Sequence, residues 1–267
     1  MQTQLFQIFL SAFFSGFVAW LAKKRGSLTT SGAWGALIVG TAIFGFGGWR
    51  WGLLLAIFFL TSSALSHFKE DEKAAVAAEK FDKGHARDWG QVMANGGLAS
   101  IIAIASALAP HPSWWLFFIG VIATVNADTW ATELGTLSSR APRLITTGRP
   151  VPPGTSGGIT LFGTTMTTCG GLLIGLSAAI ITPTIPFLFG ITLGAISGLI
   201  GSLTDSLLGA TLQAMYFDDQ TGIETEKKQL AGRPTRLIRG FAWLNNDIVN
   251  LIASIIGGTA ATFIPIL

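Results

Sequence analysis

The sequence predicts an all-α polytopic membrane protein with about eight transmembrane helices in a single integral domain and both termini outside. Half of the 267 residues are hydrophobic and only 12% are charged, whereas a soluble domain usually carries about 25% charged residues. The mean hydropathy is +0.56. The 33 glycines also fit this class, because small residues let helices approach closely in lipid.

Eight apolar segments approach or reach the length of about 20 residues that a membrane span needs. They are residues 5–22, 32–47, 51–66, 92–109, 114–134, 157–182, 185–212 and 241–264. The second and third segments are short and are separated only by Gly48-Trp49-Arg50, so a re-entrant hairpin is an alternative for this pair. The polar connections 67–91, 135–156 and 213–240 are predicted to be cytosolic loops.

The distribution of basic residues supports this topology. Every Lys and Arg except Arg50 lies in the connection after the first, third, fifth or seventh segment. Short cytosolic loops carry the excess of basic residues in membrane proteins, so the alternation predicts both termini outside. The first segment is followed by Lys23-Lys24-Arg25 and not by a small-residue cleavage site, which favours a retained span over a signal peptide.

The composition argues against several functional classes. The net charge of +3 is spread over loops between apolar segments, so the basic balance does not indicate nucleic-acid binding. Cys169 is the single cysteine, which excludes an intrachain disulfide and a cysteine-based zinc site. His67 and His85 lack partners at metal-ligand spacing, so zinc is not expected.

Carboxylates occur where membrane segments should have none. Asp128 and Glu133 lie near the cytosolic end of segment 114–134, and an Asp in hydrocarbon costs at least ~2.5–3.5 kcal/mol on the insertion scale. Asp205 lies in the seventh segment on a face of small residues, and Asp247 lies in the eighth. On the predicted topology, all four acids approach the cytosolic membrane face.

Asparagines accompany the acids at the same depth. Asn95 lies near the start of the fourth segment, and Asn126 begins the acidic stretch of the fifth. Asn246 and Asn250 are four residues apart and can line one helical surface. Helix capping is an alternative for Asn245 and Asn246, but it does not account for Asn250.

A glycine-rich stretch and two arginines indicate phosphate binding. A proline-rich approach leads into Gly154-Thr155-Ser156-Gly157-Gly158, whose N–H groups and hydroxyls stand where a helix N-terminus favours anions. A hinge or a helix-packing patch explains this stretch equally well, and it does not match the Walker A pattern. Arg143 and Arg149 lie between the acidic and glycine-rich motifs and are the best basic candidates for phosphate oxygens.

The motifs at residues 126–135, 142–158, 201–213 and 245–250, together with Asn95-Gly96-Gly97, resemble a membrane family that includes plant phytyl phosphate kinase. That family is distantly similar to dolichol kinases and CDP-diglyceride synthases. The resemblance covers nearly the whole chain. It implies a CTP-dependent kinase that converts an isoprenyl monophosphate, such as phytyl or geranylgeranyl phosphate, into the diphosphate.

Roles follow from this resemblance and from residue chemistry. The catalytic acids are expected to be Asp128, Glu133, Asp205 and Asp247. Hard carboxylate oxygens suit Mg²⁺, and its expected ligands are Asp128, Asp205 and Asp247. The residues expected to bind substrate or nucleotide phosphate are Asn95, Asn126, Arg143, Arg149, Gly154, Thr155, Ser156, Gly157, Asn246 and Asn250.

Two other activities remain open. A lipid cytidylyltransferase would use the same groups to form a CDP-lipid. An ion-coupled transporter would also need intramembrane carboxylates, although carriers tend to bind their substrates near the midplane. The expected partners are the lipid bilayer, the isoprenyl phosphate and CTP, with no nucleic acid, and homo-oligomerisation is left open. The site is expected on the cytosolic side of a plasma or thylakoid-type membrane.

Overall fold

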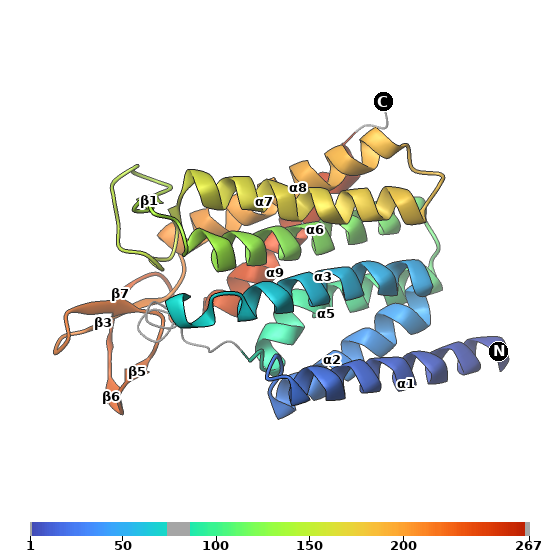
Figure 1. The fold of residues 1–267 in the computed structure, drawn as a ribbon, viewed down its shortest axis with the longest axis horizontal. Coiled ribbons are helices and arrows are strands. Elements are labelled where there is room, and N and C mark those ends of the chain that lie inside the picture. Colours follow the sequence, from blue (N-terminus) through green and yellow to red (C-terminus); the bar gives the residue numbers. More distant parts are fainter. Residues whose placement is uncertain (1, 74–85, 265–267) are drawn as a thin grey trace.

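The computed structural model describes residues 2–73 and 86–264 as a bundle of long helices with small sheets at one end (Figure 1). The helices are α1 (Gln2–Lys24), α2 (Thr30–Ala42), α3 (Trp49–His67), α5 (Trp89–Leu108), α6 (Pro112–Gly135), α7 (Leu161–Ile181), α8 (Phe187–Thr211) and α9 (Asn246–Phe263), with a short π-helix, η1 (Ile43–Gly47), that extends α2. Each predicted apolar segment corresponds to one of these helices. The last begins at Asn246 and not at residue 241, because the Asn245 side chain accepts a hydrogen bond from the backbone N–H of Ile248 and caps the helix.

Six helical segments of the described chain are long and apolar enough to cross a membrane, judged by length and composition. They are α1, α2 with η1, α3, α5, α7 and α8. The second of these runs through 18 residues to Gly47 before α3 starts, which favours two spans over a re-entrant hairpin. The helices α6 and α9 are not among the six.

The helix α6 is the centre of the bundle. Residues 118–127 are all buried, and α3, α5, α7, α8 and α9 pack around it. Because these neighbours separate α6 from the surroundings, polar residues on it can be satisfied by protein groups, which lipid does not offer. Asp128 and Glu133 lie toward the C-terminal end of this central helix.

Small residues set the spacing between α7 and α8. A Cβ atom added at Gly171 would collide with the backbone carbonyl of Gly194, and one added at Gly194 would collide with that of Gly171. A Cβ at Gly175 would meet the carbonyl of Gly190 in the same way. This is the close approach that glycine permits between membrane helices, and it fixes α8 against the core.

The connections between helices fold into small antiparallel sheets. β1 (Arg143–Leu144) pairs with β2 (Gly158–Ile159), β3 (Met215–Asp218) lies between β4 (Ile223–Thr225) and β7 (Arg236–Arg239), and β5 (Gln229–Leu230) pairs with β6 (Arg233–Pro234). The prediction of an all-α chain is therefore incomplete. Strands of two to four residues are too short to produce a clear period-two pattern in the sequence.

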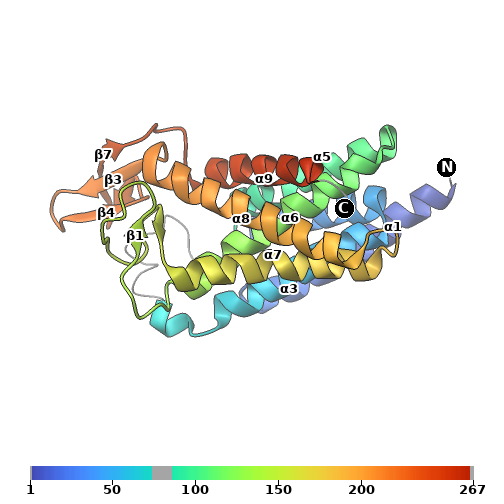
Figure 2. The same ribbon diagram turned by 90° about the horizontal axis from the view of Figure 1, so that it is seen from above.

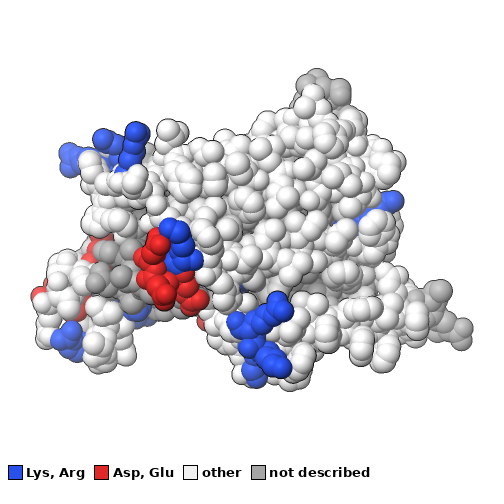
Figure 3. Space-filling view, viewed as in Figure 1, with Lys and Arg blue, Asp and Glu red and all other residues white. Residues whose placement is uncertain are grey.

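The helices alternate in direction, so both termini lie at the end opposite the sheets (Figures 1 and 2). On the face drawn in Figure 3, charged atoms gather toward the sheet end, and a broad area of the helices is free of charge. Large apolar side chains on α1 point outward, with Phe6, Phe9 and Phe13 each more than 60% exposed. An apolar band of this kind is the surface that contacts lipid in a membrane protein.

Candidate functional site

A cavity of about 720 Å³ lies at the sheet end of the bundle. Its lining comes from the ends of α3, α5, α6, α7, α8 and α9, from the connection before α7 and from the sheet that follows α8. The predicted site residues on its lining are Asn95, Asp128, Glu133, Gly154, Thr155, Ser156, Gly157, Asp205, Asn246, Asp247 and Asn250. The fold therefore brings together groups that are as far apart as residues 95 and 250 in the sequence.

Three predicted site residues are not on this lining. Asn126 is fully buried; its side chain donates to the Gly170 carbonyl at 2.8 Å and accepts from the Thr61 hydroxyl at 3.1 Å. The Asn126 side chain therefore joins α6 to α7 and α3, and it is not exposed to the cavity where a phosphate could bind. Arg143 and Arg149 are exposed, and Arg143 donates to the Gly148 carbonyl at 2.8 Å.

The basic residues on the lining, among the described residues, are not the two that the sequence favoured. They are Lys73, Arg87, Arg140 and Lys228. The sequence shows these residues as ordinary loop charges, and no local pattern distinguishes them from their neighbours. They reach the cavity only because of the way the connections pack over it. This packing cannot be inferred from local sequence, so the sequence pointed to Arg143 and Arg149, which lie between the two motifs.

Asp128 on α6 and Asp205 on α8 form a carboxylate pair at the cavity. The Ser202 hydroxyl donates to Asp128 Oδ1 at 3.2 Å, while Asp205 Oδ2 is shielded from solvent and accepts no hydrogen bond from the described residues. Asp205 is close enough to Asp128 and to Glu226 to be repelled by their charges. A buried acceptor without a donor is costly, so the pair has the character of a site that receives a cation.

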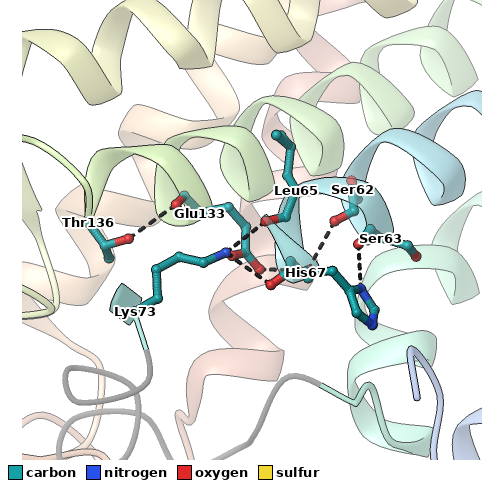
Figure 4. Close-up of polar contacts among 8 residues, drawn as sticks. Ser62, Ser63, Leu65, His67, Lys73, Glu133 and Thr136 are labelled. Carbon is teal, nitrogen blue, oxygen red and sulfur yellow. Dashed lines mark hydrogen bonds and ion pairs between the residues drawn. The ribbon is translucent and has the colours of Figure 1, made fainter. Parts of the chain in front are cut away.

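Glu133, one and a half turns further along α6, is neutralised within the protein (Figure 4). Its two carboxylate oxygens accept from the Ser66 hydroxyl at 2.6 Å and from Lys73 Nζ at 2.5 Å. The Lys73 side chain is only 4% exposed and also donates to the carbonyls of Leu65 and Ser66 at 2.7 and 3.0 Å. Lys73 thus caps the C-terminal end of α3, and Glu133 holds it there.

Arg87 adds a second buried base beside Glu133. Burial lowers the pKa of Arg87 from its usual value, and the negative charge of Glu133 opposes that change. The guanidinium donates to the Ser63 hydroxyl at 3.1 Å, and the Arg87 backbone pairs with the turn before α2 through Ser27 and Thr29. The connection before α5 is therefore fixed to α3 and to the α1–α2 turn at the edge of the cavity.

The glycine-rich stretch packs against the last turn of α8. Gly157 has φ +82° and no room for a Cβ beside Ala210, and a Cβ at Gly209 would lie 2.5 Å from the Ser156 hydroxyl. The Ser156 hydroxyl donates to Gln213 Oε1 at 3.1 Å, and Gln213 Nε2 donates to Glu226 at 2.7 Å. Gln213, only 1% exposed, thus bridges the glycine-rich loop to the sheet side of the cavity.

The start of α9 supplies the last wall. Asn245 is the N-cap, so the capping alternative holds for this residue. Asn246, Asp247 and Asn250 line the cavity, and Asn245 lies on the lining as well. Asp247 in the first turn is also favoured by the helix dipole.

The donor set fits Mg²⁺ if the substrate completes it. The described residues contain no group of three or more His, Cys, Asp or Glu side chains placed to hold a metal ion. Mg²⁺ is commonly bound by one or two carboxylates together with substrate phosphates and water. Asp128 and Asp205, with the unpartnered Oδ2, match that requirement.

Comparison with known proteins identifies the family. Residues 13–258 match the family described as integral membrane protein DUF92. The chain belongs to this family. The match confirms the family predicted from the sequence motifs and shows that the protein is an integral membrane protein.

Curated relatives of this DUF92 chain include proteins of a plant and of an archaeon. Protein PGR of Arabidopsis thaliana is 36% identical over 93% of this chain and 92% of its own length. An uncharacterized membrane protein of Methanocaldococcus jannaschii, MJ0933, is 33% identical over 97% of this chain and 95% of its own length. Protein VTE6, chloroplastic, of Arabidopsis thaliana is 27% identical over 88% of this chain, which spans 64% of that protein. No solved structure matches the chain.

Proposed function

We propose that this protein is a Mg²⁺-dependent kinase that transfers the γ-phosphoryl group of CTP to an isoprenyl monophosphate, such as phytyl or geranylgeranyl phosphate. The observation that carries the proposal is a single cavity that combines the Asp128–Asp205 pair with the loop 154–158 at one end of a membrane bundle. The proposal also rests on the resemblance of the motifs to the family that includes phytyl phosphate kinase. The choice of CTP comes from that resemblance alone.

The proposed reaction is a direct displacement. A terminal phosphate oxygen of the lipid monophosphate forms a bond to the γ-phosphorus of CTP, the bond between the γ-phosphorus and the bridging oxygen to the β-phosphorus breaks, and CDP leaves. When bound, Mg²⁺ would offset the negative charge that develops on the phosphate oxygens. Asp128 and Asp205 would hold the ion.

The remaining lining residues have positioning roles in this proposal. Backbone N–H groups of residues 154–158 would donate to phosphate oxygens, as at other anion-binding loops, whereas the hydroxyls of Thr155 and Ser156 donate to the Pro152 carbonyl and to Gln213. Arg140 and Lys228, which line the cavity, would supply positive charge to the phosphates. Asn246 and Asn250 would orient the substrate from the α9 side.

The proposed membrane arrangement has eight spans, both termini outside and the cavity on the cytosolic side. The basic connections at the sheet end support this orientation by the positive-inside rule. It would give CTP direct access from the cytosol, and the isoprenyl chain would lie among the helices. Mg²⁺, CTP and the lipid substrate are thus all expected to meet at this membrane face.

Labelled CTP tests the activity directly. Purified protein in liposomes with Mg²⁺ and phytyl or geranylgeranyl phosphate is expected to move label from the γ-position of CTP into the lipid diphosphate. The variant Asp128→Asn is expected to lose turnover, while the exposed sheet variant Asp219→Asn, whose side chain is 62% exposed, keeps it. No lipid diphosphate under these conditions would overturn the proposal for the substrates used.

The same assay separates the alternatives. Label that enters the lipid from the α-position of CTP, with release of pyrophosphate, would identify a lipid cytidylyltransferase. Solute uptake into proteoliposomes without nucleotide would identify a transporter. Either result would replace the kinase proposal.

A further inference from the structure

A second, much smaller cavity lies beneath the carboxylate pair, on the side toward the bundle interior. Its volume is about 10 Å³, close to the minimum of about 10–15 Å³ that a single water-sized occupant needs. Oxygen-bearing side chains from four helices line it: Asn95 of α5, Thr124 and Asp128 of α6, Asp205 of α8, and Asn250 and Ser254 of α9. Thr124 and Ser254 each lie one turn deeper than Asp128 and Asn250, which places this cavity below the large one.

The electrostatics of this small cavity favour a positive charge. Asp205 is repelled by Asp128, and its buried Oδ2 has no hydrogen-bond donor among the described residues. Among the described residues, Lys73 forms an ion pair with Glu133. Asp128 accepts a hydrogen bond from the uncharged Ser202, and neither Asp128 nor Asp205 forms an ion pair with a described Lys or Arg. Both acids are half-buried, and two like charges this close repel each other until a cation or a proton offsets one of them.

We propose that this small cavity is a divalent-cation site formed by the carboxylates of Asp128 and Asp205 and the amide oxygens of Asn95 and Asn250. One divalent ion would balance the two carboxylates, and the amide oxygens would add ligands without adding charge. Asp247 lines only the larger cavity, so it is not a ligand of this ion. This ligand set replaces the three-aspartate set expected from the sequence.

The site deepens the proposed kinase function and rests on it for its role. An ion held by these residues would lie beside the large cavity, whose lining they share, and would supply positive charge to nucleotide phosphates bound there. Because each of α5, α6, α8 and α9 contributes a ligand, the ion also links four helices. Binding to the folded state alone should therefore raise the thermal midpoint of the protein.

Direct metal binding tests the ligand set without any turnover. Mn²⁺ is titrated into the purified full-length protein in micelles, without nucleotide, and free Mn²⁺ is followed by electron paramagnetic resonance. We expect wild-type protein to bind Mn²⁺ in competition with Mg²⁺, Asn95→Ala and Asn250→Ala to weaken binding about tenfold or more, and Asp205→Asn to abolish it. The matched control Asp247→Asn should stay within about twofold of wild type.

Thermal unfolding of the same variants keeps the test interpretable. Without metal, Asp205→Asn should be at least as stable as wild type because one of two repelling charges is removed; with Mn²⁺ it should lose the rise in midpoint. The inference is overturned if wild type binds no Mn²⁺, if the two asparagine variants bind normally, or if Asp247→Asn weakens binding as much as they do.

The outcomes also separate the cation site from the kinase activity. If Mn²⁺ binding follows the expected variant pattern but no lipid diphosphate forms from CTP, the cation-site proposal stands and the kinase proposal fails. If the protein turns over but its metal binding depends on Asp247, the kinase proposal stands and the proposed ligand set fails.

Discussion

Asp128 and Glu133 lie five residues apart on α6, but the charge of Glu133 is paired with a base and the charge of Asp128 is not. Glu133 is bound by Lys73 and Ser66 within 2.6 Å, whereas Asp128 is paired with another acid, Asp205, and receives a hydrogen bond from Ser202. Acidity alone therefore does not identify a reactive carboxylate. The useful sign is an acid whose charge and bonding capacity the protein leaves incomplete.

The largest expected effect is the loss of turnover when Asp128 or Asp205, the two acids without a basic partner, is replaced. Asp128→Asn and Asp205→Asn should each lower the initial rate of phosphoryl transfer by roughly 10²–10³-fold, because each removes a cation ligand. Thermal stability should not fall, since the substitutions relieve repulsion. Two quantities are measured on the same preparation: the initial rate of label transfer from γ-labelled CTP, and the midpoint of thermal unfolding. Full activity in both variants would contradict the distinction drawn between the two acids.

The neutralised acid should behave in the reverse manner. Glu133→Gln leaves Lys73 buried without its counter-ion and should destabilise the fold by about 3 kcal/mol, seen as a lower midpoint in thermal or denaturant unfolding. Adding Lys73→Met to the same protein should recover part of the loss, because no unpaired charge remains. A double variant no more stable than Glu133→Gln would mean that the ion pair is not the source of the effect.

The Gln213 bridge gives a third, intermediate effect. Gln213→Leu removes both the acceptor for Ser156 and the donor to Glu226, so the loop 154–158 loses its attachment to the sheet. We expect KM for CTP to rise about tenfold, equivalent to about 1.4 kcal/mol, with a smaller change in kcat. Ser156→Ala, which breaks half of the bridge, should show a smaller rise. Equal kinetics in wild type and Gln213→Leu would exclude a positioning role.

The smallest effect concerns a paired acid outside the bundle. The hydroxyl of Thr221, the backbone N–H of Gln220 and the charge of Arg233 lower the pKa of Asp218. Because the pKa of Asp218 is lower in the folded state, the ionised side chain stabilises the sheet at pH values above the ordinary Asp pKa of about 3.9. This stabilisation is lost as the pH falls through the lowered pKa of the folded state.

Hydrogen exchange of residues 215–239, corrected for intrinsic pH dependence, measures this acid-dependent loss. Asp218→Asn should have a less stable sheet near neutral pH and a flatter pH profile in the acid range. The helices of the bundle should show no matching change, since Asp218 belongs to the sheet. A profile identical to wild type would show that Asp218 does not control the acid stability of this region.

Much of the bundle follows from the sequence. Hydropathy locates the helices, and the alternation of basic loops agrees with the observed gathering of the connections at the sheet end. Helical periodicity also predicts that Asp128 and Glu133 differ, because five residues turn the side chain by about 140° on the helix. The sequence thus indicated where the acids lie along the chain, although it assigned the same catalytic role to Asp128 and Glu133.

The tertiary structure decided which neighbours those are. Asn126 turns inward to Gly170 and Thr61, Lys73 reaches Glu133, and Arg143 and Arg149 lie outside the cavity. These partners are separated by 44 to 65 residues, so no local pattern encodes them. Periodicity fixes the face on which a side chain stands, but the packing of distant helices determines whether that face meets a base, another acid or an empty space.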